Sequence, residues 1–312
     1  MANILNNSDG GFHIGIMCLI YRVLRRSSVP MRMEKIEEMC RPKNLPTGDN
    51  QGKKFKQHLN FWMDESHCLW RLNRDSMLEL CEETKTVRDD PNPFEIAEMV
   101  RKSLFSKSIS DITVPIRSTK NEEKILLLIL SCLLASGRHL PFGSDGSLKK
   151  ATYVEIDDLI GSYLEREKYG LNTNEKPFVI PWLLFLGFAE VHGGKIFVDP
   201  TRAVRNSLSH IFKSEKSLDI TIFLSLLSDA LPVLDGGNYQ KQTSKVMEKK
   251  GRTTYDYKRH ISPALAVAFY RLEALKVIKF VGKSDDPLAK QIEHTVTKVP
   301  ESISQIIYLG GD

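Results

Sequence analysis

Basic side chains alternate with tyrosines in one short stretch, residues 251–260, which reads GRTTYDYKRH. Its candidate contact residues are Arg252, Tyr255, Tyr257, Lys258 and Arg259. Guanidinium and ammonium groups pair with phosphate, while tyrosine rings stack on a sugar or a base. The stretch is therefore the strongest candidate for nucleic-acid contact, with an ordinary exposed linker as the alternative.

A second group of basic residues opens a predicted helix near the N-terminus. Lys53, Lys54 and Lys56 follow Gly52 within about one helical turn. The first turn of the DNA-reading helix is the part that approaches DNA in helix-turn-helix proteins. We therefore expect these lysines to contact phosphate. The overlapping run GDNQGKK is not expected to bind a nucleotide, because its glycines are one residue too close and no Ser or Thr follows the lysines.

The remaining chemistry-bearing residues do not form a catalytic constellation. The eight histidines show no metal-ligand spacing such as H-x-x-x-H, and no G-x-S-x-G motif occurs. Asp157 and Asp158 stand at the start of an amphipathic helix, where negative charge suits the helix dipole, and Asp285 and Asp286 suit a turn. Because chemistry at a site needs convergent groups, we expect no enzyme activity, no metal and no cofactor.

The helices and strands that would position the basic groups belong to a repeated sequence pattern, a helix followed by a strand and a turn, which is clearest in residues 262–286. Leu265, Phe269, Leu272 and Leu275 recur at three- and four-residue spacing, which predicts a helix with one buried face. The run VIKFV then alternates apolar and polar residues, which predicts a half-buried strand, and GKSDDP predicts the hairpin tip. We expect residues 291–298 to return as the second strand and residues 303–309 to form a short helix or strand.

The same pattern occurs in residues 177–200, where Leu183 and Leu186 precede Gly187. Phe188–Val191 and Lys195–Val198 form the predicted hairpin around the tip at residues 192–194. A fainter copy has Phe55, Leu59 and Met63 as the helical stripe and residues 68–72 as the strand. Repetition of one unit at wide spacing indicates an array of similar modules.

We therefore predict a mainly α protein with small β-hairpins, of the α+β class, built from three tandem modules. The predicted divisions are module 1 at residues 1–81, a linker with one amphipathic helix at 82–120, module 2 at 121–214 and module 3 at 215–312. The third helix of module 2 is almost uncharged and carries Trp182 and Phe185, a composition that suits protein contact better than phosphate contact. Both aromatic residues could equally fill the core.

Charge and cysteine content limit the partner and the compartment. The formal net charge is +5, and residues 1–60 and 241–260 each hold a net +5, so the rest of the chain is net acidic. Two basic patches on a near-neutral body suit phosphate contact at defined modules, and solvated helical faces are the alternative. The five cysteines form no C-x-x-C pair and suit small buried hydrophobes in a reducing compartment. With no signal peptide and no sufficiently long apolar run, we expect a cytoplasmic protein that does not cross a membrane.

The stretches LFLGFAEVHGGKIFVDP and YRLEALKVIKFVGKSDD resemble the winged-helix superfamily over about two thirds of the chain. With three copies and long loops, the architecture is similar to the DpdG-like accessory proteins of bacterial DNA-modification and anti-phage islands. The resemblance implies recognition-helix positions for Lys53, Lys54 and Lys56. It implies wing positions for the lysines in the strands and tips of modules 2 and 3. These wing residues are Lys195, Lys279 and Lys283.

These patterns lead to a first hypothesis, a non-catalytic adaptor that grips double-stranded DNA with weak sequence preference. Modules 1 and 3 would contact the backbone, and module 2 would hold one or more protein subunits. Lysine-rich surfaces bind phosphates, whereas base readout needs fixed bidentate groups. The alternatives are a scaffold that binds only protein, and a winged-helix transcription regulator, which would need an effector pocket and a dimer helix.

Overall fold

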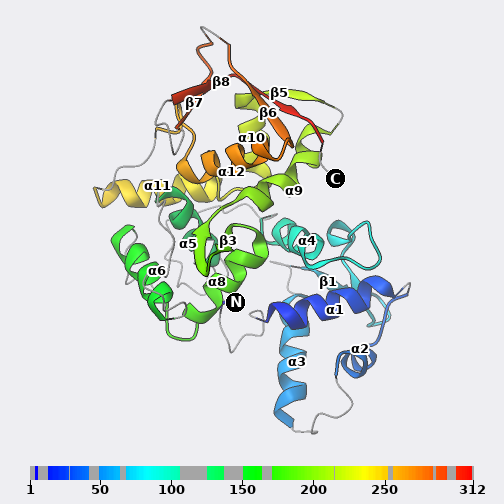
Figure 1. Cartoon of the computed structure of the whole chain (residues 1–312). Helices are drawn as coiled ribbons and strands as arrows, with labels where there is room; N and C mark the ends of the chain where they lie inside the picture. Colours follow the sequence, from blue (N-terminus) through cyan, green and yellow to red (C-terminus); the bar gives the residue numbers. More distant parts are fainter. Residues whose placement is uncertain are drawn as a thin grey trace. The chain divides into compact units, whose positions relative to one another are not determined.

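Helices dominate the computed structural model of the protein, and short antiparallel strands complete it (Figure 1). The predicted mainly α class with small β-hairpins is thereby confirmed. The structure describes residues 4–5, 13–27, 29–41, 49–63, 68–105, 125–136, 150–163, 171–213, 215–251, 256–283, 286–293 and 300–310. The chain divides into unit 1 (Met1–Ser108, Thr119–Glu123 and Asn172–Leu186) and unit 2 (Ile109–Ser118, Lys124–Leu171 and Gly187–Asp312).

Unit 1 begins with three helices and a hairpin. The elements are α1 (Ile14–Arg26), α2 (Met33–Cys40), α3 (Asp49–Phe61), β1 (Trp70–Leu72) and β2 (Leu78–Leu80). The buried face of α1 carries Met17, Ile20, Tyr21 and Leu24, which recur at three- and four-residue spacing. Between α1 and α2, Met31 forms a two-hydrogen-bond bridge to Leu78, with N–O distances of 2.9 and 2.7 Å. The strand order is therefore Met31, β2, β1.

The segment after this hairpin, which includes the short helix η1 (Glu82–Thr84), is held against α1. The Tyr21 hydroxyl donates to the Thr84 carbonyl and accepts from the Thr86 amide. Arg22 Nε donates to the Pro91 carbonyl at 3.0 Å, and Arg25 Nε donates to the Thr86 carbonyl at 3.0 Å. Residues 84–91, in the predicted linker, are thus fixed to the first helix by side-chain to backbone hydrogen bonds.

Two further helices belong to unit 1, α4 (Pro93–Phe105) and α8 (Lys176–Leu186). Asn92 caps α4, since its side-chain oxygen accepts from the amides of residues 94 and 95, and Glu95 accepts in return from the Asn92 amide at 2.8 Å. The buried Arg101 of α4 donates to the Leu186 carbonyl at the end of α8, at 2.7 Å. Its positive charge satisfies a carbonyl that lacks a partner within its own helix.

The cysteines of unit 1 differ from the sequence expectation. Cys68 and Cys81, which flank the β1–β2 hairpin, pair as a disulfide across 13 residues. We predicted free thiols throughout, because sequence spacing does not reveal that the two ends of a hairpin lie side by side. Cys18, Cys40 and Cys132 are free, and burial raises the pKa of each thiol, to about 11 for Cys18 and Cys40 and about 12 for Cys132.

Unit 2 contains the buried helix α5 (Ile125–Ala135), all of whose residues are buried, as its unbroken aliphatic sequence predicts. It packs against α11 (Asn238–Lys249) and α6 (Lys150–Tyr163). The predicted hairpin is present as β3 (Ala189–His192) and β4 (Lys195–Val198). Gly193 and Gly194 at its tip have φ of 56° and 75°, the positive values that a two-residue hairpin turn requires.

The rest of unit 2 surrounds a three-stranded sheet. Its elements are α9 (Thr201–Phe212), β5 (Ser217–Asp219), α10 (Ile220–Ala230), α12 (Pro263–Ala274), β6 (Ile278–Val281) and β9 (Gln305–Tyr308). The strand order is β5, β9, β6, all antiparallel. Four phenylalanines from α9, α10, α12 and β6 form its aromatic core, with successive ring centroids 5.6, 5.8 and 6.0 Å apart. They are Phe212, Phe223, Phe269 and Phe280.

The two clear copies of the helix-to-strand pattern both have a residue with positive φ between the helix and the strand. Gly187 after α8 has φ of 80°, and Lys276 after α12 has φ of 56°. At the second copy the Val277 amide bonds to the Leu272 carbonyl at 2.9 Å, which closes the end of α12. The match inferred from the leucine spacing is therefore a match of backbone conformation.

The predicted second wing strand is wrong in its pairing. Residues 290–293 form β7, but β7 pairs with β8 (Pro300–Ile303), whereas β6 pairs with β9. The run GKSDDP follows β6 but does not connect it to its partner strand, so it is not the tip of a two-stranded hairpin. The strand β8 instead continues directly into β9 at Ser304, whose amide donates to the Val281 carbonyl at the end of β6, at 2.9 Å. Strand pairing here is decided by contacts between distant residues, which local alternation does not specify. Residues 305–308 form a strand, one of the two predicted possibilities.

Candidate nucleic-acid interface

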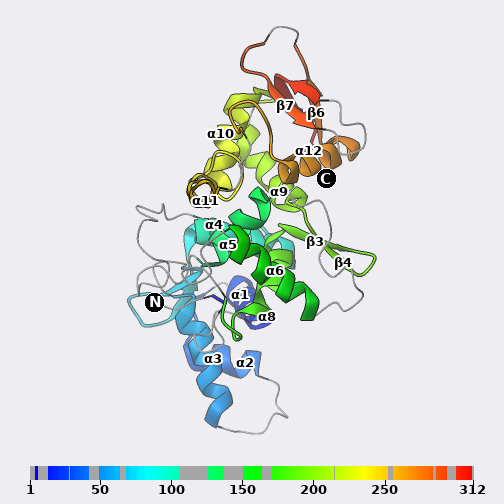
Figure 2. The ribbon, with the colours of Figure 1, turned by 90° about the vertical axis from the view of Figure 1, so that its left-hand side faces the viewer.

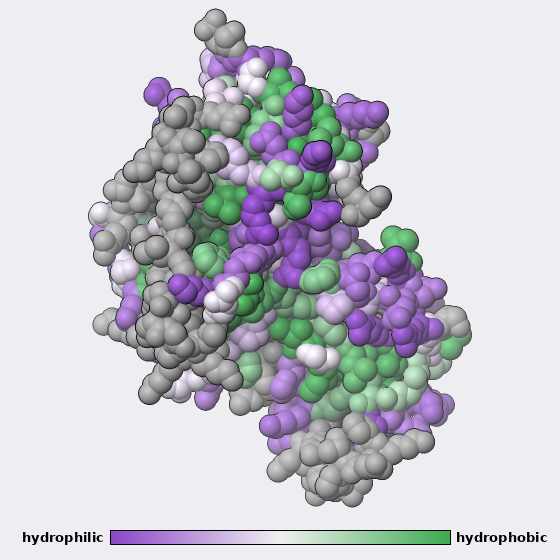
Figure 3. All heavy atoms as spheres, viewed as in Figure 1, coloured by the Kyte–Doolittle hydropathy of each residue, from purple (hydrophilic) through white to green (hydrophobic). Residues whose placement is uncertain are grey.

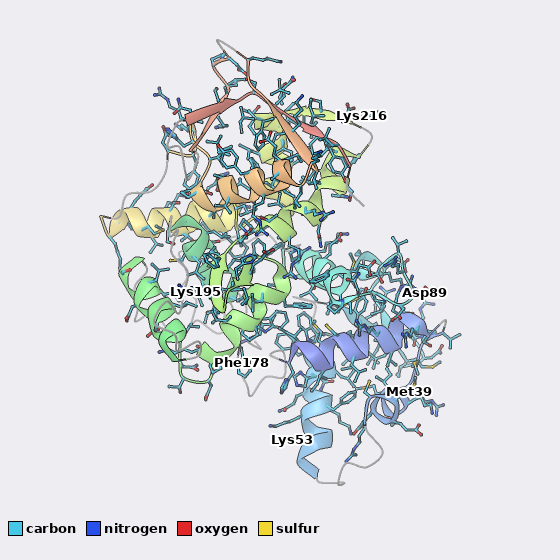
Figure 4. The ribbon with its side chains drawn as sticks, viewed as in Figure 1. Met39, Lys53, Asp89, Phe178, Lys195 and Lys216 are labelled. Atoms are coloured by element: carbon cyan, nitrogen blue, oxygen red, sulfur yellow. A yellow bond between two sulfur atoms is a disulfide. The ribbon has the colours of Figure 1, made fainter. Side chains whose placement is uncertain are left out.

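The first candidate group lies on α3 in unit 1. Lys53, Lys54 and Lys56 are exposed, whereas His58 and Leu59 on the same helix are buried. Figure 4 shows Lys53 on α3. Lys53 and Lys56 are one helical turn apart, so they project from the same side. An amphipathic helix with lysines on its free face can approach a phosphate backbone.

His58 adds no positive charge to this helix at neutral pH. Burial is the main cause that lowers the pKa of His58 to about 4, and the nearby His13 ring and the Lys54 ammonium lower it further. The two imidazole rings lie with their centroids 5.4 Å apart. The positive surface of α3 is therefore supplied by its lysines.

The arginines of α1 are engaged within the protein. Arg25 pairs with Asp89 at 2.7 Å and Arg26 pairs with Asp90 at 2.7 Å. The net positive charge that the sequence places in residues 1–60 is thus partly neutralised by carboxylates from later in the chain. Any phosphate contact by these two helices would depend on α3 and not on α1.

The second candidate group lies in unit 2, where the basic junction is a structured turn. Lys258 and Arg259 are exposed, and Tyr257 is half-buried. Asp256 closes the turn, since its side chain accepts from the Lys258 amide at 3.1 Å and its carbonyl accepts from the His260 amide at 2.8 Å. Arg252 and Tyr255 lie outside the described residues.

The turn runs beside strand β7, in the segment predicted as the second wing strand. The Gln291 amide bonds to the Arg259 carbonyl at 2.8 Å, and the Ile261 amide bonds to the Gln291 carbonyl at 3.0 Å. A parallel bridge joins His260 to Gln291. We call residues 257–259 with β7 the basic edge. The fold thus brings the predicted basic junction and the predicted wing together, although some 30 residues separate them in the sequence.

The predicted wing lysines of module 3 lie on or just after β6, which belongs to the three-stranded sheet and not to the β7–β8 pair. Lys279 is exposed on β6 and lies opposite Ile307 of β9. Lys283 is exposed just after β6, and its amide donates to the Ser304 hydroxyl at 3.1 Å. Figure 2 shows β6 and β7 on one side of α12, which contacts both strands. Exposed cations therefore occupy β6 and the segment that leads from it.

Lys195 is the exposed first residue of β4, beside the tip of the β3–β4 hairpin (Figure 4). Its neighbourhood is mixed in charge. His192 lies 3.0 Å from Glu190 on the same hairpin. Within the described β3–β4 hairpin, Lys195 therefore stands beside an acid–histidine pair and not among further lysines or arginines.

Helix α12 is a core element. Leu265, Phe269 and Leu272 are fully buried, and the guanidinium of Arg271 is paired with Glu190 at 2.8 Å and with Asp199. Arg271 joins α12 to the β3–β4 hairpin and to the start of α9, so it is engaged within the protein. Any nucleic-acid contact by this part of the chain would therefore depend on the basic edge and β6.

Sequence reasoning missed Lys290 and Asp235. Lys290 opens β7 and donates from its ammonium to the carbonyls of Tyr257 and Lys258. Asp235 is buried and accepts from the Ser262 amide, at the start of α12, at 2.7 Å. Burial raises the pKa of Asp235 to about 6, against the opposing effects of the Ser262 hydrogen bonds and the Lys290 charge. Nothing in the local sequence distinguishes these two residues from ordinary surface charges.

The aromatic pair proposed for protein contact is split by the structure. Trp182 is fully buried, with its ring centroid 6.1 Å from that of Trp62, so it fills the core. Phe185 is half-buried and packs edge-on against Trp182 at 5.6 Å. The core alternative is therefore the correct one for Trp182.

Within the described residues, no group of three or more His, Cys, Asp or Glu side chains could hold a metal ion. Over the same part of the chain, no helix combines the length and apolar character needed to cross a bilayer.

Comparison with known proteins identifies one family. Residues 2–286 match a family model described as DpdG-like. No curated protein and no solved structure matches the chain.

Proposed function

The chain belongs to the DpdG-like family, and on this premise we propose that it is a non-catalytic DNA-binding adaptor of a DNA-modification or anti-phage defence system. It would act in the cytoplasm. The family match spans almost the whole chain and is consistent with an accessory protein of a DNA-modification system. The basic edge is the observation that supports DNA contact most directly.

The order of elements supports a winged-helix interpretation of two regions. A winged helix has a three-stranded sheet. The strand between its first two helices pairs with the last strand of the wing, and that last strand also pairs with the first strand of the wing. Residues 14–80 have this order, with Met31 bridged to β2 and β2 paired with β1. Residues 201–308 repeat it, with β5 paired with β9 and β9 paired with β6. Here α11 lies between the second and third helices, and β7 and β8 extend the wing.

The exposed cations support contact with the DNA backbone. Lys258, Arg259, Lys279 and Lys283 are all exposed on the turn, on β6 or just after it. Flexible lysines recognise phosphate as a point charge and do not supply the fixed bidentate geometry of base readout. We therefore propose binding to double-stranded DNA with weak sequence preference.

The adaptor role requires a surface for a protein subunit. Figure 3 shows apolar side chains gathered over α1, in the lower right of the view. Leu19 on α1 is 42% exposed and Met39 on α2 is 53% exposed. Exposed apolar groups close together support protein contact. In the predicted module 2, Phe185 is half-buried and Val191 is exposed, and we propose that these two side chains contact a protein subunit.

The test is DNA binding by two charge-reversal sets. Set one changes Lys53, Lys54 and Lys56 to Glu, and set two changes Lys258 and Arg259 to Glu. A matched control changes Lys35, Lys85 and Lys102 to Glu, since each of these exposed lysines is already paired with a glutamate. Affinity for a mixed-sequence duplex is measured by fluorescence anisotropy over a range of salt concentrations.

We expect the wild type to lose affinity steeply with salt, because each phosphate contact releases counterions. Both test sets should abolish binding, and the control should retain it within about threefold, because surface ion pairs contribute little. Equal binding by the wild type and both sets would favour the protein-only scaffold. An affinity that does not change between low and moderate salt would also reject the proposal.

A further inference from the structure

Lys290 stands out among the basic residues of unit 2 because its ammonium points back into the protein. It is half-buried, whereas Lys258 and Arg259 beside it are exposed. Its Nζ donates to the Tyr257 carbonyl at 3.1 Å and also to the Lys258 carbonyl. A cation bound in this way has few donors left for a phosphate.

Three successive carbonyls of the turn accept from two successive residues of β7. Those of Tyr257 and Lys258 accept from the Lys290 side chain, and that of Arg259 accepts from the Gln291 amide at 2.8 Å. Carbonyl oxygens that converge on one place repel one another unless a donor satisfies them. Two of the three accept from a single ammonium group, so Lys290 ties the turn to β7 in addition to the backbone bonds that close it.

The surroundings keep this ammonium in place. Burial lowers the pKa of Lys290, while the Asp256 and Asp235 carboxylates oppose that effect. Asp256 also closes the turn through its hydrogen bond to the Lys258 amide. The Lys290 ammonium is thus held by the carbonyls of Tyr257 and Lys258, which belong to the turn whose conformation it stabilises.

We propose that Lys290 is a positioning residue: by holding the carbonyls of Tyr257 and Lys258, it fixes the turn on which Lys258 and Arg259 are presented to phosphate. The inference rests on the proposed DNA binding, but it assigns Lys290 a role different from that of a phosphate-contacting lysine. Removing Lys290 should disable two other cations in addition to removing one charge.

The test compares Lys290→Met with Lys283→Met. Both variants lose one positive charge from unit 2, but Lys283 is exposed and, among the described residues, its hydrogen bond is made by its backbone amide to Ser304. The slope of log affinity against log salt is measured for each variant with a mixed-sequence duplex. Removing one phosphate contact lowers the slope by about 1. We expect this for Lys283→Met and a decrease of about 2 for Lys290→Met.

A double-mutant cycle isolates the positioning role. In a Lys258→Gln and Arg259→Gln background, adding Lys290→Met should weaken binding by less than about twofold, because the side chains it positions are absent. In the wild-type background the same change should weaken binding by about tenfold or more at low salt. Equal losses in the two backgrounds, or equal slope changes for Lys290→Met and Lys283→Met, would overturn the inference.

Hydrogen exchange provides a readout that does not involve DNA. The Gln291 and Ile261 amides are bonded across the turn and the wing, so their exchange should become at least about tenfold faster in Lys290→Met and stay unchanged in Lys283→Met. Unchanged exchange in Lys290→Met would refute the positioning role even if the protein binds DNA. Faster exchange without any DNA binding by the wild type would support the positioning role and reject the proposed function.

Discussion

Replacing Asp235 with asparagine should stabilise the protein at neutral pH. Asp235 lies in a buried loop whose residues Leu231, Val233 and Leu234 are also buried, and its carboxylate accepts from the Ser262 amide. Burial disfavours the charged form and raises the pKa of Asp235 from 3.8 to about 6. An asparagine keeps an acceptor oxygen for Ser262 and carries no charge to desolvate.

The pH dependence follows from the direction of this change. A carboxyl group with a raised pKa in the folded state binds its proton more tightly there than in the unfolded chain. Its contribution to stability is complete below pH 3.8, declines as pH rises, and is lost once pH passes about 6. The interval corresponds to a change of about 3 kcal/mol in the free energy of unfolding. Asp235→Asn removes this dependence.

Urea denaturation at several pH values between about 4 and about 7 measures the effect. We expect Asp235→Asn and the wild type to differ little near the acidic end, and the variant to be more stable by up to about 3 kcal/mol near neutral pH. Asp286→Asn is the control with the opposite sign. The Leu288 amide lowers the pKa of Asp286, so the wild-type side chain favours the folded state at neutral pH and loses that effect as pH falls. A stability difference for Asp235→Asn that does not change with pH would refute the reasoning.

Two further perturbations test the turns and the charge pairs of unit 2. Lys276→Gly should raise the free energy of unfolding, measured by urea denaturation, by about 1 kcal/mol, because Lys276 has φ of 56°, a value that glycine adopts without strain. Gly187→Ala in the matching turn should lower the free energy of unfolding, since the added Cβ would lie 3.1 Å from a backbone nitrogen of α9. The opposite sign for either variant would contradict the shared turn. Arg271→Met should destabilise the protein by about 2 kcal/mol at neutral pH, because Glu190 and the buried Asp199 lose their cation. Part of this loss of stability should disappear when Glu190→Gln is added to Arg271→Met. An unchanged denaturation midpoint for Arg271→Met would show that the pairs do not contribute.

The local structure was largely predictable because it follows from periodicity and capping. The helical stripe of Leu265, Phe269 and Leu272, the hairpin after Gly187 and the fully buried α5 all occur where residue spacing places them. Leu275, which we also predicted in the buried stripe, lies just after α12 and is 57% exposed. The exposure of Lys53, Lys54 and Lys56 follows in the same way, since they lie outside the apolar stripe of α3.

The pairing of strands and the use of charges were not predictable from the sequence. β6 pairs with β9 and leaves β7 to β8, because pairing is settled between segments far apart in the chain. The same holds for Arg25 and Arg271, which look like surface cations in the sequence and are paired with acids from other elements.

The sequence by itself therefore determined the main helices, the β3–β4 hairpin and the strand β6, since these depend on neighbours within a few residues. The tertiary structure alone decided which cations remain available to a partner. It closes residues 257–259 against β7 through Lys290 and Gln291 and pairs the arginines of α1 and α12 with carboxylates. The physical reason is that hydrogen bonds and ion pairs depend on distances of about 3 Å in space, and a linear sequence does not contain those distances.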